Sequence, residues 1–280
     1  MRRAKIYSLL ITLLIGSVTM VIYLYRNGVI QVVNPPRSQY PVRGVVVSAG
    51  HGEIDWNVIR SQDMAFAYIK ATDGDSIADS MFAENYSRIR RSGMRVGVYH
   101  CFRFDAGGLA QAEYFIAAVI GEEREPPDEY TIGYNEHGEY IEYVEKDPML
   151  PPAVYIELYG DYANNPPGRD GVCEQLNAFI LRVTEEFGAA PVIYVTVEAY
   201  GMYIGGALAD CGMWILDTAA PPRMRYGEPW VFWQYTEKGR LNGFRGFEKF
   251  IGLIAFNGTE QEFFEYSNVI FPMGKEAEQE

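Results

Sequence analysis

Glu157 is the acidic residue that the sequence places best for chemistry. It directly follows a short apolar run, Ala153 to Ile156, in the stretch "LPPAVYIELYGD", and that run predicts a buried strand. Side chains alternate along a strand, so Tyr155 and Glu157 point to the same face. A carboxyl group at this position can give or take a proton in catalysis. The alternative is a structural role, in which the hydrogen bonds of Glu157 hold its strand in place.

Aromatic side chains lie near the ends of several other apolar runs. One carboxylate among several aromatic rings is typical of a carbohydrate-binding cleft. The residues that we expect to contact substrate are Tyr99, Tyr155, Tyr194, Trp233 and Tyr235. Simpler roles are expected for the remaining polar candidates. His51 is a loop residue that contacts substrate or water, and Asp55 is a helix cap. Asp73 is an acid that orders its loop, and His100 is a core histidine.

Short apolar segments alternate with amphipathic helices after residue 42. The predicted strands cover residues 43–48, 66–72, 95–102, 153–156, 191–196, 213–217, 230–236 and 249–258. Strands that alternate with helices imply a parallel sheet that is covered on both faces. About eight such units in roughly 240 residues favour a closed, TIM-like β/α barrel of the α/β class, with its chemistry at the carboxyl ends of the strands. An open doubly wound sheet is the alternative, but "VVVSAGHGEIDW" lacks the glycine-rich phosphate loop that it favours.

The N-terminus carries the clearest targeting signal. The run from Ile6 to Tyr25 is uncharged, and its 20 residues match a bilayer core of ~30 Å at ~1.5 Å per residue. Arg2, Arg3 and Lys5 are expected to stay in the cytoplasm under the positive-inside rule. We therefore predict a cytoplasmic N-terminus at 1–5, a transmembrane signal anchor at 6–25 and a linker at 26–41. The C-terminal domain then lies outside the cytoplasm in a single-pass arrangement.

Charge and cysteine content exclude several classes of partner. The net charge is −13 and no basic stripe is present, so nucleic acid is not expected to bind. There is no C-x-x-C pair, and we expect no metal and no cofactor. Cys173 and Cys211 are candidates for a disulfide, a pairing that the sequence leaves open.

One acidic segment interrupts the alternation of strands and helices. Within residues 122–149, "YTIGY" and "EYIEYV" flank "NEHG", which predicts a β-hairpin. The segment follows a helix and precedes a strand, so in a barrel it lies on the face opposite the usual active site. It is a candidate binding site for a protein partner, or a solvated insertion. Residues 42–266 are expected to form the barrel, and residues 267–280 a polar tail.

Six motifs in this order resemble glycoside hydrolase family 25, the lysozymes or N-acetylmuramidases that cut peptidoglycan. They are "RGVVVSAGHGEIDW", "FAYIKATDG", "GMRVGVYHCFR", "QAEYF", "LPPAVYIE" and "FWQYT". The likeness covers roughly residues 42–265. It implies a flattened, irregular β/α barrel with a groove for a glycan strand. Together with the predicted signal anchor, we expect a protein of the bacterial cell membrane.

The sequence departs from the catalytic pattern that the resemblance implies. Glu157 matches the family's general acid, but Tyr155 stands where the fourth strand's D-x-E has its aspartate. Val46 takes the place of the aspartate in the first strand, G-[IV]-D-V-S. Gly252 takes the place of the aspartate in V-D-x-N, before F-N-G. An alternative register puts Glu248 near that missing aspartate.

These losses leave three hypotheses for function. The favoured one is a membrane-anchored, lysozyme-like protein directed at peptidoglycan glycan strands, with hydrolysis weakened or lost, a possible pseudoenzyme. The second is an active N-acetylmuramidase that cleaves the MurNAc–GlcNAc bond with retention, using Glu157 as general acid and a relocated carboxylate. Candidates for the relocated carboxylate are Asp161, Asp217 and Glu248. The third is a membrane-tethered interaction domain that works through residues 122–149.

Overall fold

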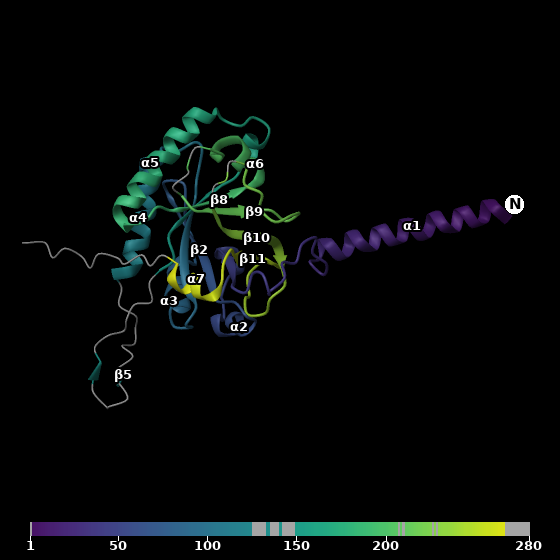
Figure 1. Cartoon of the computed structure of the whole chain (residues 1–280), viewed down its shortest axis with the longest axis horizontal. Coiled ribbons are helices and arrows are strands. Elements are labelled where there is room, and N and C mark those ends of the chain that lie inside the picture. Colours follow the sequence, from purple (N-terminus) through teal and green to yellow (C-terminus); the bar gives the residue numbers. More distant parts are fainter. Residues whose placement is uncertain are drawn as a thin grey trace, which may run out of the picture.

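The computed structural model describes residues 2–124, 133–134, 140–141, 149–206, 208, 211–225, 227 and 229–266. The first helix, α1 (Arg2–Arg26), extends away from the rest of the molecule as a single rod (Figure 1). Its apolar window Leu9–Arg26 is long enough to cross a membrane, and none of that window is buried in the protein. The segment predicted as the anchor is therefore a helix that is long and apolar enough to cross a membrane.

Eight strands form a closed barrel. The order around the barrel is β1, β11, β10, β9, β8, β7, β4, β2, and the pairing of β2 with β1 closes it. Closure excludes the open doubly wound sheet, and the predicted β/α barrel is confirmed. The strands are β1 (Arg43–Val47), β2 (Phe66–Asp73), β4 (Arg95–Cys101), β7 (Ala153–Ile156), β8 (Val192–Thr196), β9 (Met213–Leu216), β10 (Trp230–Gly239) and β11 (Ile251–Phe256), while the short β3 (Ile77–Ala78) pairs with β2 outside the ring.

The eighth strand corrects the expectation of a purely parallel sheet. β11 runs antiparallel to both of its neighbours, β1 and β10. The described connection between β10 and β11 contains no helix, and a parallel return would need a crossover of a dozen or more residues. The chain therefore reverses directly, and the barrel is mixed.

The strands are apolar on both faces because both faces are buried. One face fills the inside of the barrel with large rings, including Tyr68, Tyr194, Trp214 and Phe232. The other face packs against the surrounding helices and loops. This arrangement produces the near-continuous apolar runs that mark the strands in the sequence.

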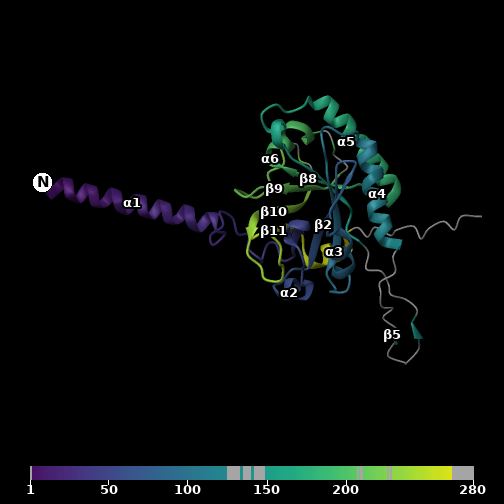
Figure 2. The same cartoon turned by 180° about the vertical axis from the view of Figure 1, so that it is seen from behind.

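Helices cover the barrel unevenly. The two long helices α4 (Gly108–Arg124) and α5 (Arg169–Phe187) pack against each other on one flank, and α1 leaves from the opposite flank (Figure 1 and Figure 2). The other helical segments are short, and they are η1 (Ala49–His51), α2 (Trp56–Ser61), α3 (Phe82–Ile89), η2 (Gly160–Ala163), α6 (Val197–Ala199), η3 (Tyr200–Ile204) and α7 (Glu260–Glu265). The predicted cap of α2 is confirmed, because Asp55 accepts a hydrogen bond from the Val58 amide.

Part of the acidic segment is described. β5 (Gly133–Tyr134) and β6 (Tyr140–Ile141) pair antiparallel, as a hairpin requires. The rest of residues 125–148 and the expected tail at 267–280 lie outside the described residues. Among the described residues, Cys101, Cys173 and Cys211 form no disulfide, and the Cys173 thiol donates to the Tyr203 carbonyl.

Candidate functional site

Glu157 lies at the carboxyl end of β7, at the rim that we call the barrel mouth. The mouth is formed by the carboxyl ends of the parallel strands, as at Asp73, Cys101 and Thr196. The hydroxyl of Tyr155 donates a hydrogen bond to Oε2 of Glu157 over 2.7 Å. Both side chains are half-buried. The expectation that the two residues share one face of the strand is confirmed by this bond.

Three aromatic rings form a stack inside the barrel beside Glu157. The Tyr155 ring stacks on Tyr194 with centroids 4.1 Å apart, and Tyr194 stacks on Trp214 at 3.8 Å. Tyr99 meets Tyr194 edge-on at 6.0 Å. The hydroxyl of Tyr194 donates to Oε1 of Gln234 over 2.5 Å. The stack therefore fixes the orientation of the Tyr155 hydroxyl that contacts Glu157.

The tyrosines at this site are hydrogen-bond donors. Burial raises the pKa of Tyr99, Tyr155 and Tyr194 well above the ordinary value, and the charge of Glu157 adds to the rise for each of them. Their hydroxyls therefore stay protonated at neutral pH. They can orient a carboxyl group or a sugar substituent, but they supply no negative charge.

Two of the positions singled out in the sequence are neighbours on the barrel wall. Val46 on β1 pairs directly with Gly252 on β11. A Cβ placed on Gly252 would lie 3.3 Å from the Val46 Cβ and 2.9 Å from Nε2 of Gln234. This part of the wall is therefore formed by an apolar side chain, a bare backbone and a neutral amide.

Trp233 and Tyr235 are not brought to the mouth. Both are buried on the outer face of the barrel, where Trp233 donates from Nε1 to the Asp217 carbonyl and Tyr235 lies under the guanidinium of Arg43. Their inner neighbours on β10 are Phe232 and Gln234. The structure thus places Tyr99, Tyr155 and Tyr194 with Glu157, and separates Trp233 and Tyr235 from it.

His100 is held in the layer between the barrel and α4. Nδ1 lies 2.8 Å from Oγ1 of Thr72 and Nε2 lies 3.1 Å from Oε1 of Gln111. That oxygen also accepts from the Arg103 amide, while the Gln111 amide group donates to carbonyls, so the neutral ring carries its proton on Nε2. Burial lowers the pKa of His100 to about 4. These contacts give His100 the core role expected of it.

The two remaining loop candidates also have local partners. His51 is buried against Phe244, and burial lowers its pKa. Asp73 forms an ion pair with Lys70 at 2.7 Å, and because both residues belong to β2, the pair lies within the carboxyl end of that strand. Among the described residues, no group of three or more His, Cys, Asp or Glu side chains is arranged to hold a metal ion.

The three carboxylates considered as replacements have different surroundings. Asp217 accepts hydrogen bonds from the Ala219 and Ala220 amides, which fixes the turn after β9. Glu248 lies against Gly50, and its charge acts on His51. Asp161 is exposed on η2.

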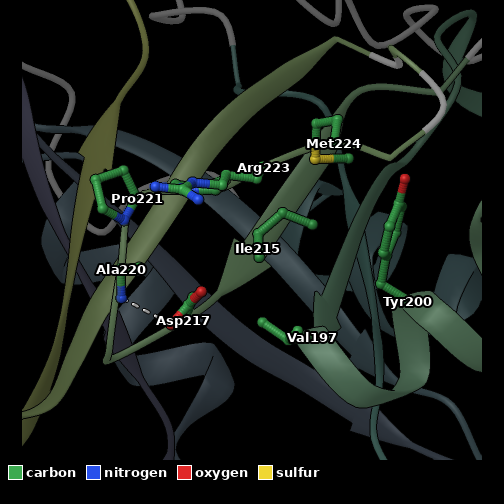
Figure 3. Close-up of a pocket in the computed structure, with 9 residues that line it drawn as sticks. Val197, Tyr200, Ile215, Asp217, Ala220, Pro221, Arg223 and Met224 are labelled. Carbon is green, nitrogen blue, oxygen red and sulfur yellow. Dashed lines mark hydrogen bonds between the residues drawn. The ribbon is translucent and has the colours of Figure 1, made fainter.

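Asp217 also borders a cavity of about 270 Å³ at the ends of β8 and β9. Its walls are mainly apolar, and Figure 3 shows Arg223 on the Asp217 side and Met224 nearer to Tyr200. The Asp217 carboxylate points back to the Ala220 amide in this view. The cavity therefore adds an apolar recess to the rim, two strands away from Glu157.

Sequence reasoning missed Glu237, which follows the motif "FWQYT" on β10. Its side chain is exposed at the rim, and partial burial of the carboxyl group raises its pKa. The negative charge of Glu157 is the second cause of that rise, and the adjacent Lys238 opposes it. Strict alternation from Trp233 would put Glu237 on the outer face, so no pattern in the sequence indicates that Glu237 faces the site.

Comparisons with known proteins agree on one family. The family model "Glycosyl hydrolases family 25" matches residues 45–244. Lysozyme M1 of Streptomyces globisporus is 30% identical over 226 residues, which cover 75% of this chain and 67% of that protein. A family 25 glycosyl hydrolase from Bacillus anthracis has a similar structure, with 34% identity, a TM-score of 0.70 and coverage of 85% and 97%. A lysozyme from Streptomyces coelicolor follows with 27% identity, a TM-score of 0.65 and coverage of 81% and 97%.

Proposed function

We propose that this chain, which belongs to glycosyl hydrolases family 25, is a membrane-anchored protein directed at the glycan strands of peptidoglycan. It hydrolyses these strands with reduced turnover. The relatives named lysozyme support this choice of substrate. The observation that carries the proposal is the position of Glu157, half-buried at the barrel mouth and bonded to Tyr155.

Glu157 acts as the proton donor in this proposal. Hydrolysis of a glycosidic bond needs an acid that protonates the leaving oxygen while positive charge develops on the sugar ring. The Tyr155 hydroxyl binds one carboxyl oxygen of Glu157 and leaves the other for the substrate. The stacked rings of Tyr155 and Tyr194 give the site a rigid apolar wall on which a sugar can pack.

Turnover is reduced because the wall opposite this acid lacks charge. Val46 and Gly252 pair where the family pattern has aspartates, and neither side chain can stabilise a cation. The loss of one preorganised electrostatic contact typically costs about 3–4 kcal/mol, or 10²–10³ in rate. Such losses are not additive, so activity is expected to fall without vanishing.

A second candidate is binding of the glycan strand without cleavage. The apolar pair of Val46 and Gly252 favours it, because a groove can keep its shape and its aromatic walls after the catalytic charges are lost. A protein partner at residues 122–149 is a separate hypothesis.

The anchor supports a location outside the cytoplasm. The basic residues at positions 2, 3 and 5 precede the apolar part of α1, which orients the barrel to the far side of the membrane. Lys238, at the end of β10, lies over the ring of Tyr25 with 4.1 Å between its ammonium group and the ring centroid. The anchor therefore leaves next to the rim of the barrel, and we propose that the site works on glycan close to the membrane.

The test uses the full chain in detergent micelles, incubated with purified peptidoglycan sacculi. New reducing ends report cleavage, and co-sedimentation reports binding. Glu157→Gln removes the proton donor at constant size. Glu185→Gln is the matched control, since Glu185 is exposed on α5 outside the barrel mouth.

Slow release of reducing ends that disappears in Glu157→Gln and persists in Glu185→Gln supports hydrolysis. Co-sedimentation without any new reducing ends supports the binding protein. A chain that neither binds nor cleaves the sacculi overturns both.

A further inference from the structure

β10 contains two successive irregularities that change which residues face the barrel interior. Gln234 pairs with Ile254, but the next pairs are Thr236 with Leu253 and Gly239 with Ile251. Tyr235 and Thr236 therefore share one partner, and Glu237 and Lys238 together oppose Gly252. Such bulges turn the side chains that follow them.

The first bulge brings Glu237 to the inner face of the barrel, because it leaves Thr236 opposite Leu253 and the following residue, Glu237, opposite Gly252. Leu253 and Ile251 belong to the outer layer, whereas Gly252 pairs with Val46, which faces inward. Residues that stand opposite each other on antiparallel strands share a face. Glu237, the first of the two residues opposite Gly252, is thus on the inner side, and Gly252 itself offers no side chain there.

The surroundings of Glu237 agree with this placement. The charge of Glu157 raises the pKa of Glu237, and the charge of Glu237 raises the pKa of Tyr155 and Tyr194, two residues of the aromatic stack. Lys238 is directed to the ring of Tyr25 instead. Gln234, three residues earlier on the same strand, accepts from the Tyr194 hydroxyl. The end of β10 is therefore joined to the wall that carries Glu157.

We propose that Glu237 is the second carboxylate of the catalytic site, supplying from β10 the negative charge that Val46, Tyr155 and Gly252 do not provide. This inference rests on the proposed function and assigns a residue that the family pattern does not contain. With Glu237, a site whose wall is uncharged at Val46 and Gly252 still has a negative charge that faces its proton donor, Glu157.

Hydrolysis of the glycosidic bond needs only these two carboxyl groups and one water molecule. Glu157 gives its proton to the glycosidic oxygen as the bond from that oxygen to C1 breaks, and the bonding electron pair leaves with the oxygen. The protonation state that reacts has the proton on Glu157 and an ionised Glu237, and in this state Glu237 stabilises the positive charge at C1. A water oxygen then bonds to C1, and the water returns one proton to Glu157.

The experiment compares Glu237→Gln with Glu157→Gln and with the control Glu185→Gln, all in the full chain in detergent. We expect Glu237→Gln to lower kcat by about 10²–10³ with little change in KM, because the lost contact acts only in the transition state. Unchanged co-sedimentation and an unchanged midpoint of thermal unfolding show that the variant is folded. Glu237→Asp should recover part of the rate.

A second readout does not need turnover. Carbon-13 NMR titration of the Glu237 carboxyl group should show a lower pKa in Glu157→Gln, because a neighbouring like charge has been removed. Tyr155 and Tyr194 stay neutral over this range, and Lys238 is present in both proteins.

The outcomes separate the two proposals. If the wild type cleaves and Glu237→Gln cleaves equally well, Glu237 is not the second carboxylate, while the proposed hydrolysis stands. If the pKa of Glu237 is the same in Glu157→Gln, the two carboxyl groups are not coupled and the pair is wrong. If the wild type binds but never cleaves, the catalytic pair and the proposed hydrolysis both fail, whatever the titration shows.

Discussion

Val46 and Gly252 stand directly opposite each other on β1 and β11, and a Cβ on Gly252 would lie 3.3 Å from the Cβ of Val46. The inner wall is thus uncharged on two adjacent strands. Gln234 closes the space over Gly252, with its Nε2 2.9 Å from that Cβ position. A carboxylate can therefore be restored more easily at position 46 than at position 252.

Val46→Asp should raise turnover by about tenfold to a hundredfold, since it adds a charge to the wall that faces the developing cation. The same change should lower the free energy of unfolding by about 1–3 kcal/mol, because Val46 is buried. Release of reducing ends and urea unfolding measure the two effects. Val46→Asn is the control, with similar size and no charge, and it should lower the free energy of unfolding by a similar amount without raising turnover. Equal turnover in both variants would show that charge at this position does not limit the rate.

Tyr155→Phe should lower turnover by about tenfold, because Glu157 loses a hydrogen bond that holds its carboxyl group. The ring remains, so its stack on Tyr194 and the binding of glycan should persist. Kinetics and co-sedimentation test these expectations. Tyr114→Phe on α4 is the control, and a Tyr155→Phe variant as active as this control would argue against an orienting role for the hydroxyl.

His100 should make the protein sensitive to acid. Its pKa is about 4 in the folded protein and near 6.5 in an unfolded chain, so the unfolded state binds more protons between these values. The stability that its neutral form gives is complete above about pH 6.5 and is lost as pH falls toward 4. From this residue alone, we expect about 2 kcal/mol less stability near pH 5 than near pH 7.5.

Urea unfolding of wild type and His100→Gln at both pH values measures this contribution. The variant is expected to be less stable than wild type at neutral pH, since Thr72 and Gln111 lose their ring partner. Its stability should nevertheless change less between the two pH values. The same pH dependence in both proteins would assign the acid sensitivity to other groups.

Removal of residues 2–26 should release the barrel from the membrane fraction, because α1 carries the apolar window and the barrel contributes no second helix of that kind among the described residues. A subtler change is the double substitution Leu14→Arg and Ile15→Arg. Each arginine costs about 2.5–3.5 kcal/mol at the centre of a spanning helix, so insertion should fail. Fractionation of cells measures both variants, and a truncated protein that still sediments with membranes would contradict an anchor at α1.

The sequence determined the features that depend on local pattern. Apolar runs of four to ten residues located all eight strands of the barrel, and an uncharged run of 20 residues located α1. Alternation placed Tyr155 and Glu157 on one face, and their 2.7 Å hydrogen bond agrees. These properties are set by residues that are near one another in the chain.

Tertiary structure alone decided which face of β10 is the inner one and where its bulges lie. Both faces of a barrel strand are buried, so the sequence of β10 does not indicate whether Trp233 or Gln234 faces the interior. The pairing of the strand with its neighbours decides this. The bulges arise from the register between β10 and β11, and they turn Glu237 inward after Tyr235 has turned outward. Register is a relation between two distant segments, and for this reason the position of the second carboxylate could not be found from the sequence of either strand.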